Sequence, residues 1–350
     1  RSQFTDNTAW FQGPTSLVFD PKDNQHFFVG TFSLGILEFQ GSELIDYYNC
    51  YRNEGIESII PNTYTTRIGG MSIGDDGYLW FVNVGVENPL RCITPSGRIL
   101  SYPVKGYASI SNAYDRMIQA KNDPYKFKWI LGINPWEKCQ AAIYYDGGTP
   151  EDLSDDENVA FNTLTDQDGN QYSPKHFNDI AEDKNGKIWL LTTSGPFVID
   201  SQIEAYKKPG SVRRVKIPRN DGTNYADYLL AGVDCTCIAI DAADHKWIGT
   251  KDDGIYVLSA DGLTQLEHFT TDNSPLYSNT ILAFAYDETS GTVYISCEGG
   301  IVSYVTDAIK GADDYSNVIC YPNPVRPEFT GQLHITGLKD NTKVKICDIT

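Results

Sequence analysis

Histidine is the side chain that most often moves protons or binds metals near neutral pH, and this 350-residue sequence has five of them. They never form the H-x-H or H-E-x-x-H pairs that hold a catalytic metal, and no G-x-x-x-x-G-K-[ST] phosphate loop occurs. The five are His26, His176, His245, His268 and His334. We therefore predict no catalytic, cofactor-binding or metal-binding residue, and we interpret the histidines as structural or surface side chains.

The eight cysteines are spread along the chain without any C-x-x-C pair, which fits neither a zinc ribbon nor a disulfide-rich miniprotein. Cys235 and Cys237 flank Thr236 in a strand-like run. Two residues apart on a strand, their side chains would face the same way, which suits either a metal or burial. Because C-x-C lacks the further ligands of a tetrahedral site, we predict buried free thiols.

Most carboxylates fall in Asp/Asn/Gly turns, where Asp bonds to nearby backbone. The stretch TDQDGNQY contains Asp166 to Asn170, which resembles a calcium loop but lacks the third oxygen ligand and the closing Glu. We interpret it as a polar hairpin tip. Carboxylates brought together by the fold for glycoside cleavage stay an open alternative.

The elements that carry these side chains repeat along the chain. A large aromatic in a short apolar strand returns every 47 to 60 residues, as in YLWFVN, KIWLLT and HKWIGT. The six aromatic anchors are Phe28, Trp80, Trp129, Trp189, Trp247 and Tyr294. Each anchor strand follows another strand across a turn such as Asp76-Gly77, Asn185-Gly186 or Ser290-Gly291, which is a hairpin signal.

A third strand follows a glycine, as in GILEF, GPFVID, GIYVLS and GGIVSY, and a fourth is more polar, as in RRVKI and QLEHF. Four strands on a period near 50 are typical of a propeller blade. We predict an all-β fold: a β-propeller with six visible four-stranded blades, and seven possible. The anchor tryptophans would then fill the space between adjacent blades as core residues.

The overall charge of the sequence limits which partners the protein is expected to bind. The formal net charge is -18 and the pI is near 4.6, so nucleic acid is not an expected partner. One basic segment breaks this trend, and we interpret it as a strand with solvated side chains; it holds Lys207, Lys208, Arg213, Arg214, Lys216 and Arg219. No apolar run reaches the length of a membrane span. Because the sequence has no basic, apolar leader and no initiator Met, we expect an internal piece of a longer, exported protein.

The pattern D-x-x-G-x-[IL]-W-[IL]-G-T…G-I is kept best from Asp241 to Ile255, where His245 and Lys246 replace the usual glycine turn. It resembles the two-component-regulator propeller repeat, which is found in the periplasmic sensor halves of hybrid histidine kinases of Bacteroidetes. The resemblance implies a propeller over roughly residues 10 to 305. It says little about the ligand.

The last 30 residues, YPNPVRPEFTGQLHITGLKDNTKVKICDIT, look like the opening of the C-terminal domain of type IX secretion substrates and components, where PNP begins a small β-sandwich. The form is similar to that of a surface component whose propellers precede such a domain. Leu333 and Ile335 alternate on one strand, and Val344 and Ile346 on the next. Two strands are a fragment of a sandwich of about seven. The resemblance implies retention at the outer membrane or recognition of anionic lipopolysaccharide.

One interval departs from the repeat and is the predicted binding region. Residues 134–174 stretch the third interval to 60 residues and place Trp136, Tyr144 and Tyr145 beside acidic loops. Long loops on a rigid ring often bind ligands, and aromatic side chains beside polar groups suit glycans. These three residues are the ligand-binding candidates, while AAIYY also fits an ordinary third blade strand.

We predict a propeller over residues 1–305, a linker over 306–320 and the start of a truncated sandwich over 321–350. The predicted function is a non-enzymatic binding and assembly module of the cell envelope, in the periplasm or on the cell surface, with envelope proteins or surface glycan and lipopolysaccharide as partners. The alternative is a periplasmic ligand-sensing propeller of a hybrid two-component regulator. A propeller glycosidase or lyase is the third possibility.

Overall fold

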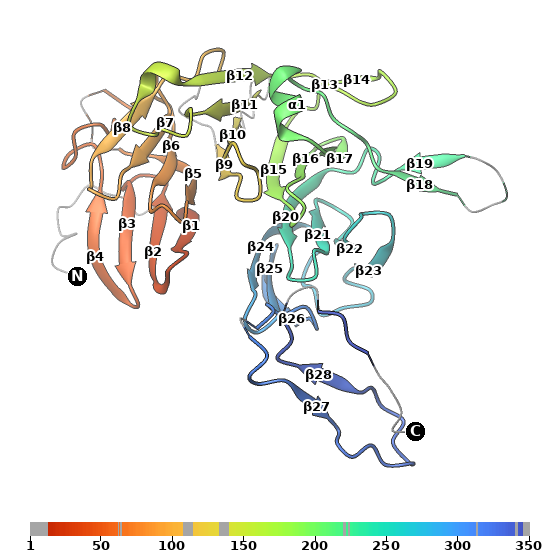
Figure 1. The fold of residues 1–350 in the computed structure, drawn as a ribbon. Helices are drawn as coiled ribbons and strands as arrows, with labels where there is room; N and C mark the ends of the chain where they lie inside the picture. The colour runs from red at the N-terminus through yellow and green to blue at the C-terminus, as the bar shows by residue number, and fades with distance from the viewer. Residues whose placement is uncertain are drawn as a thin grey trace.

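The computed structural model describes residues 13–61, 63, 65–107, 115–132, 140–219, 222, 225–312, 314–339 and 342–345. Six small antiparallel sheets follow one another along the chain and are arranged around a common centre (Figure 1). The six helical residues of α1 (Gln202–Lys207) are the only α-helix in the described part of the chain. The predicted all-β propeller with six blades is confirmed.

Each sheet is one blade, numbered here in chain order, and its strands run outward from the centre in sequence order. Blade 1 contains β1 (Pro14–Asp20), β2 (Asp23–Thr31), β3 (Ile36–Gln40) and β4 (Glu43–Tyr48). Blade 2 contains β5 (Ile68–Ile73), β6 (Leu79–Asn83), β7 (Leu90–Ile93) and β8 (Ile99–Tyr102). Blade 3 contains β9 (Arg116–Gln119), β10 (Lys128–Gly132), β11 (Gln140–Tyr145) and β12 (Glu157–Phe161).

In the second half of the ring, the predicted four strands occur in blade 5, whereas blades 4 and 6 have three strands each among the described residues. Blade 4 contains β15 (Phe177–Glu182), β16 (Ile188–Thr192) and β17 (Gly195–Ile199). Blade 5 contains β20 (Cys235–Ile240), β21 (Lys246–Thr250), β22 (Ile255–Leu258) and β23 (Gln265–Phe269). Blade 6 contains β24 (Ile281–Asp287), β25 (Thr292–Cys297) and β26 (Gly300–Val305).

The segment RRVKI does not form the predicted fourth strand of blade 4. Arg213 forms only an isolated bridge with Val198 beside β17, through two backbone hydrogen bonds of 2.7 and 2.8 Å. The chain then leaves the sheet, and β18 (Lys216–Pro218) pairs with β19 (Ala226–Tyr228) in a separate hairpin that projects from the ring (Figure 1). A second short hairpin, β13 (Leu164–Thr165) with β14 (Gln171–Tyr172), and the 3-10 turn η2 (Leu153–Asp155) complete the described elements of the ring.

The anchor aromatics occupy equivalent positions in the middle of each blade. Trp80, Trp129, Trp189 and Trp247 are at most 2% exposed, and each packs against the side chains of the following blade. The predicted role of the tryptophans between blades is therefore confirmed. Tyr294, the anchor of blade 6, differs from the tryptophans: it is 48% exposed, because no described blade covers that face of blade 6.

Cys235 and Cys237 are buried, as predicted, and neither forms a disulfide. Their predicted common direction is wrong. A β-bulge between them shifts the register against β21, so Cys235 packs into the core between blades 4 and 5, and Cys237 packs into the core between blades 5 and 6. Burial raises the pKa of Cys235 to about 12 and raises that of Cys237 as well, which keeps both thiols protonated.

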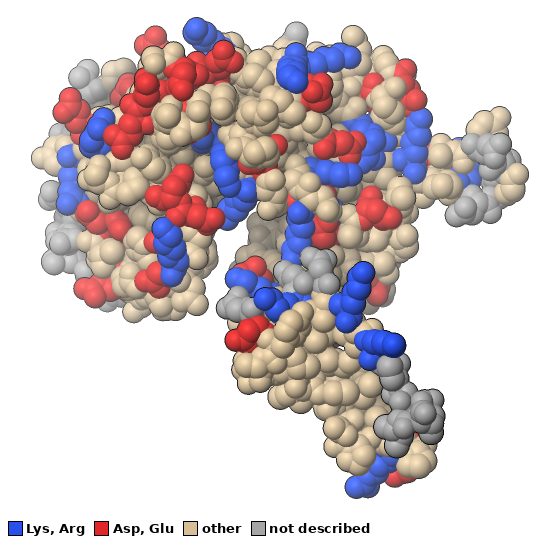
Figure 2. Space-filling view, viewed as in Figure 1, with Lys and Arg blue, Asp and Glu red and all other residues tan. Residues whose placement is uncertain are grey.

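Neighbouring blades meet through their innermost strands. β1 packs on β5, β5 on β9, β9 on β15, β15 on β20, and β20 on β24. No comparable contact joins β24 to β1 among the described residues. In Figure 2 the surface is hollowed between these two ends of the ring.

Beyond blade 6 the chain continues into a two-stranded tail, β27 (Ile319–Tyr321) paired with β28 (His334–Thr336), which extends away from the ring (Figure 1). Its surface shows few charged side chains in Figure 2. Ile319, Tyr321 and Val325 are each about half exposed. No helix among the described residues is long and apolar enough to cross a membrane.

Candidate functional site

In blades 4 and 5, an aspartate six residues before the anchor tryptophan shapes the hairpin turn. Asp183 accepts backbone hydrogen bonds from Asn185 and Lys187 through Oδ1, and Trp189 donates its indole N–H to Oδ2 at 3.2 Å. Asp241 repeats this arrangement with Trp247, whose Nε1 lies 3.1 Å from Oδ2. The acidic turn and the tryptophan are therefore one structural unit. The spacing D-x-x-x-x-x-W in the sequence carries this signal, which residue types alone do not reveal.

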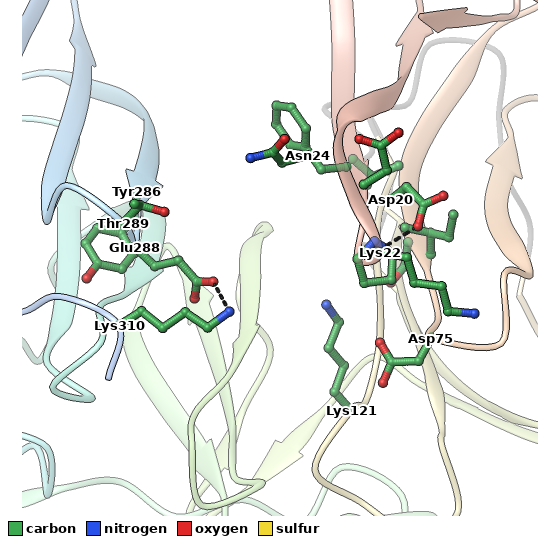
Figure 3. A pocket seen from close by; sticks show the side chains of 15 residues that line it. Asp20, Lys22, Asn24, Asp75, Lys121, Tyr286, Glu288, Thr289 and Lys310 are labelled. Carbon is green, nitrogen blue, oxygen red and sulfur yellow. Dashed lines mark hydrogen bonds and ion pairs between the residues drawn. The ribbon is translucent and has the colours of Figure 1, made fainter. Parts of the chain in front are cut away.

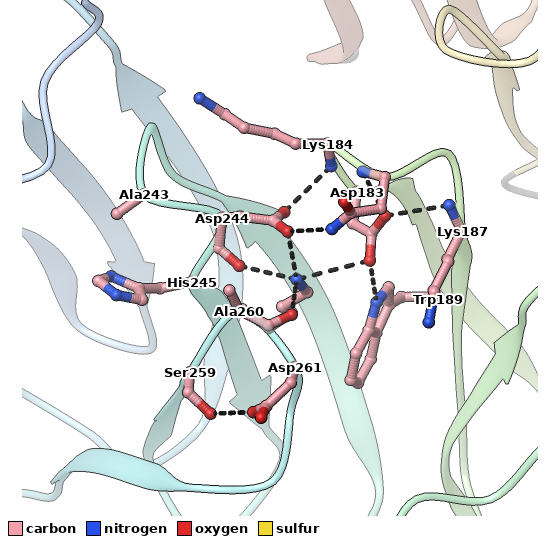
Figure 4. Close-up of polar contacts among 12 residues, drawn as sticks. Asp183, Lys184, Lys187, Trp189, Ala243, Asp244, His245, Ser259, Ala260 and Asp261 are labelled. Atoms are coloured by element: carbon pink, nitrogen blue, oxygen red, sulfur yellow. Dashed lines mark hydrogen bonds and ion pairs between the residues drawn. The ribbon is translucent and has the colours of Figure 1, made fainter. Parts of the chain in front are cut away.

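A buried lysine next to the Asp183–Trp189 pair links blades 4 and 5. The Lys246 ammonium is fully buried and lies 3.1 Å from Asp244 Oδ2 and 3.5 Å from Asp183 Oδ2. It also donates to the carbonyl of Ala260 at 2.6 Å. Figure 4 shows Asp183, Trp189 and Asp244 converging on this point from the two blades. The charge is therefore matched by carboxylates on both sides of the interface.

Asp244 stands where blade 4 has Gly186, and both residues have a left-handed backbone, with φ of 65° and 77°. Asp tolerates this conformation better than most residues. Its carboxylate accepts hydrogen bonds from the Lys184 backbone and the Asn185 amide of blade 4, both at 3.0 Å. The replacement of the usual turn glycine thus adds a link between blades.

A buried lysine of blade 3 likewise contacts the anchor tryptophan of blade 2. The buried Lys128 ammonium lies 4.4 Å from the centre of the Trp80 ring and 2.5 Å from Asp146. Burial lowers the pKa of Lys128 from its ordinary value, and Asp146 opposes that shift. Both lysines directly precede an anchor tryptophan and cover the tryptophan of the preceding blade. These polar clusters hold the ring together and do not form an open site.

The carboxylate of Asp166 is also fully occupied by hydrogen bonds from neighbouring residues. It accepts hydrogen bonds from the backbone of Asp168 and Asn170 and from the side chains of Asn170 and Tyr172, at 2.9 to 3.0 Å. Burial alone would raise its pKa, but the hydrogen bonds lower it to about 2. Among the described residues, no three His, Cys, Asp or Glu side chains gather as a metal site would require.

The stretch Gly70–Gly74 has the G-x-S-x-G spacing of a nucleophile elbow. Ser72 lies inside β5, with 9% of its surface exposed, and its Oγ accepts a backbone hydrogen bond from Gln119 at 3.1 Å. An elbow requires a sharp turn from strand to helix, and β5 instead turns into β6. This serine is part of the contact between blades 2 and 3.

The structure separates the predicted ligand-binding residues. Trp136 lies outside the described residues. Tyr144 is 1% exposed and packs against Tyr102, so it can support a site only from beneath. Tyr145, on the same strand β11, is half-buried against Tyr125 and Phe127. The third-strand interpretation of AAIYY is confirmed, and ligand binding at these residues stays a prediction.

Neighbouring carboxylates neutralise most of the positive side chains of the basic segment. Arg213 pairs with Asp200, Lys216 with Asp168, and Arg219 with Asp227. Arg214 is buried, and its guanidinium lies 4.7 to 5.3 Å from the ring centres of Tyr172, Phe197 and Tyr228. The segment therefore has little unpaired positive charge to offer an anion.

The candidate binding site is a cavity of about 950 Å³ between the two ends of the ring. Side chains of both ends face it in Figure 3, with blade 6 on one side and blade 1 on the other. The residues labelled there are Asp20, Lys22, Asn24, Asp75, Lys121, Tyr286, Glu288, Thr289 and Lys310. Hairpin turns of blades 1, 2, 3 and 6 supply most of these side chains, so the ring itself positions the site.

Charges of both signs line the cavity and are partly paired. Lys310 lies 3.0 Å from Glu288. A hydrogen bond from His26 lowers the pKa of Asp20, and one from Gln40 lowers that of Asp23, so both stay ionised. This near balance gives no preference for an anion over a cation. The cavity suits a polar ligand or a polar protein segment.

No protein-family profile matches the chain, and no curated protein matches it by sequence. Among solved structures it is similar to PorZ from Porphyromonas gingivalis, described as an essential bacterial surface component of the type-IX secretion system. The TM-score is 0.74 at 28% sequence identity, over 92% of this chain. The chain has the fold of the part of PorZ that it matches.

The match covers 43% of the PorZ chain, so this chain spans less than half the length of PorZ. The extracellular domain of a hybrid two component system from B. thetaiotaomicron is also similar, with a TM-score of 0.51 at 16% identity over 88% of this chain and 33% of that one. This second likeness shows the fold alone. Both families named from the sequence are thus found among the structural neighbours.

Proposed function

We propose that this chain is part of a non-enzymatic binding and assembly module of the cell envelope, with a role like that of PorZ in type IX secretion. The observation that carries the proposal is the likeness to PorZ over 92% of this chain. PorZ is a surface component, and we accordingly assign this chain to the periplasm or the cell surface. Its partners in this role are other envelope proteins, with surface glycan or lipopolysaccharide as a further candidate.

The division of labour follows from the two parts of the chain. The six blades give a rigid platform, while the tail exposes apolar side chains such as Ile319, Tyr321 and Val325. We assign residues 1–305 to the platform, 306–320 to a linker, and 321–350 to the start of a β-sandwich. A tail of two strands buries its apolar residues only when further strands or a partner cover them.

A deletion tests this assignment. Removing everything after Cys320 from the full-length protein should leave the propeller folded but abolish surface attachment or secretion. Cell fractionation, secretion of a type IX substrate and a thermal melt of the purified protein measure the three properties. A matched control carries Leu263→Ser, which changes an exposed apolar residue in a turn of blade 5.

The proposal fails if the deleted protein localises and supports secretion as the control does. That result would favour the alternative, a ligand-sensing propeller of a hybrid two-component regulator. Activity of the purified protein against a polysaccharide panel would instead support a propeller glycosidase or lyase.

A further inference from the structure

One buried anchor tryptophan differs from the others in its hydrogen bonding. In blades 4 and 5 the indole N–H donates to the aspartate six residues earlier. In blade 3 the N–H of Trp129 donates to Oε1 of Gln202 at 2.7 Å. Trp80 of blade 2 is fully buried, and its Nε1 has no hydrogen-bond partner among the described residues. A buried donor without an acceptor is costly, so this N–H requires an explanation.

The missing acceptor follows from the turn of blade 2. Gly74 stands six residues before Trp80, where blades 4 and 5 have their aspartates. Because the hairpins are equivalent, the N–H of Trp80 faces the side-chain position that Gly74 leaves empty. A Cβ on residue 74 would collide with Asp76 Oδ1 and would lie 3.0 Å from Gln119 Oε1. Gln119 therefore points at the same place as the tryptophan N–H.

Gln119 is the second buried group at this place without a partner. It lies on β9 of blade 3 and is 7% exposed, and its Oε1 accepts no hydrogen bond from any described residue. It pairs with the residue before Trp129, as Glu182 pairs with the residue before Trp189. Glu182 accepts the backbone N–H of Lys121 in the preceding blade at 2.6 Å. Gln119 occupies the equivalent position but finds no donor.

The next interface shows which group bridges such a pair. Gln202, at the start of α1, is 2% exposed. Its Oε1 accepts the N–H of Trp129, and its Nε2 donates to Glu182 Oε1 at 3.1 Å and to the carbonyl of Gly186 at 2.9 Å. One carboxamide thus satisfies a tryptophan N–H and an oxygen of the following blade. Between blades 2 and 3 both groups are present, and no described side chain bridges them.

A cavity of about 170 Å³ lies at this place between the turns of blades 2 and 3. Residues 74–76 of blade 2 form one wall, and residues 119–121 and Lys126 of blade 3 form the other. One water needs about 10 to 15 Å³ of such space, so the cavity admits a larger group. Two aspartates and two lysines in these walls balance in charge. The lining therefore favours a neutral polar group over an ion.

We propose that this cavity binds a carboxamide, the side chain of an asparagine or glutamine presented by a partner protein. Its oxygen accepts the N–H of Trp80, and its NH₂ donates to Gln119 Oε1, as the Gln202 amide does one blade further along. The exposed Asp76 side chain borders this place and swings outward to admit the group. The choice of a protein as the source of the carboxamide rests on the proposed assembly role, whereas the site itself does not.

The indole N–H signal of Trp80 in an NMR spectrum of the 350-residue chain tests the proposal, and Trp80→Phe assigns this signal. Acetamide should shift the signal and leave those of the other tryptophans in place, with half-saturation near about 1 mM. Methyl acetate cannot donate a hydrogen bond, and acetate is an anion that only accepts. Both should bind at least about tenfold more weakly, because Gln119 Oε1 then stays without a donor.

Two variants remove the two halves of the site. Gly74→Asp should abolish the response to acetamide, because an aspartate at this position takes the tryptophan N–H as in blades 4 and 5. Gln119→Met removes the acceptor and should weaken acetamide binding at least about tenfold. Gln265→Met makes the same change at an exposed position of β23 and is the matched control. Unchanged signals of the other tryptophans show that each variant is folded.

Two tripeptides test the source of the carboxamide. Gly-Gln-Gly should displace acetamide and Gly-Glu-Gly should not, since only the side chain differs. A Trp80 signal that acetamide leaves unmoved would assign the cavity to water and overturn the proposal, and so would an equal shift in Gly74→Asp. Binding of acetate or Gly-Glu-Gly as tight as that of its amide counterpart would assign the site to an anion and would also overturn it. These readouts do not involve localisation or secretion, so failure of the site is distinct from failure of the envelope role.

Discussion

The interface between blades 4 and 5 and the outer face of blade 6 use equivalent positions in opposite ways. Trp189 is 1% exposed, bonded to Asp183, and covered by the buried Lys246 of blade 5. Tyr294 occupies the same register position in blade 6 and is 48% exposed. The anchor position therefore holds a large aromatic residue whether or not a neighbouring blade covers it. How much the anchor side chain contributes to stability depends on that neighbouring blade.

Truncation of a covered anchor should have the largest effect. Trp189→Ala removes a fully buried ring and its hydrogen bond to Asp183, and it should lower the free energy of unfolding by about 3 to 5 kcal/mol. Denaturant melts of the purified chain measure the loss. A change near zero would mean that the core between the two blades does not depend on this ring.

Removal of the buried lysine should rank second. Lys246→Ala leaves Asp183, Asp244 and the Ala260 carbonyl without their cation, and it should cost about 3 kcal/mol. The control is Lys187→Ala, which breaks the exposed pair with Asp200 and should cost less than about 1 kcal/mol. Equal losses for the two variants would contradict the role assigned to burial.

Blade 1 should contain a pH-dependent link, formed by His26 and two carboxylates. His26 lies 3.0 Å from Asp20 and 2.7 Å from Glu38. Partial burial alone would lower its pKa, but the two carboxylates raise it above its ordinary value of 6.5. The raised pKa contributes stability that is complete below pH 6.5 and is lost as the pH rises through the folded-state value.

The pKa of Asp20 is lowered, so its contribution is present above pH 3.8 and is lost as the pH falls through the folded-state value. The link should therefore be strongest between about pH 4 and 6.5. Thermal melts of the chain and of His26→Phe at about pH 5.5 and pH 8.5 measure it. The melting temperatures should differ more at the lower pH, and an equal difference at both would refute the assignment.

The smallest effect belongs to the uncovered anchor. In the 350-residue chain, Tyr294→Ala should change the free energy of unfolding by no more than about 0.5 kcal/mol, because the ring is half exposed. The same denaturant melts apply. A loss as large as that of Trp189→Ala would show that something already covers this face and would remove the contrast between the two regions.

The repeat made the blades predictable, since each hairpin carries its own turn residues, apolar alternation and anchor aromatic. The spacing of Asp183 and Trp189 was equally available in the sequence, because both belong to one turn. The candidate cavity was not predictable. Asp20, Lys121 and Glu288 are far apart in sequence, and each alone is an ordinary turn or surface residue.

By itself, the sequence determined the six-fold succession of small antiparallel sheets, because strand alternation and turn chemistry act over a few residues. Tertiary structure decided the rest. The bulge after Cys235 sends the two thiols into different cores, and Lys246 reaches Asp183 only when the two blades meet. The sequence around Tyr294 matches that around the buried anchor tryptophans. Whether the Tyr294 side chain is buried depends on a neighbouring blade, and the local sequence does not show whether such a blade is present.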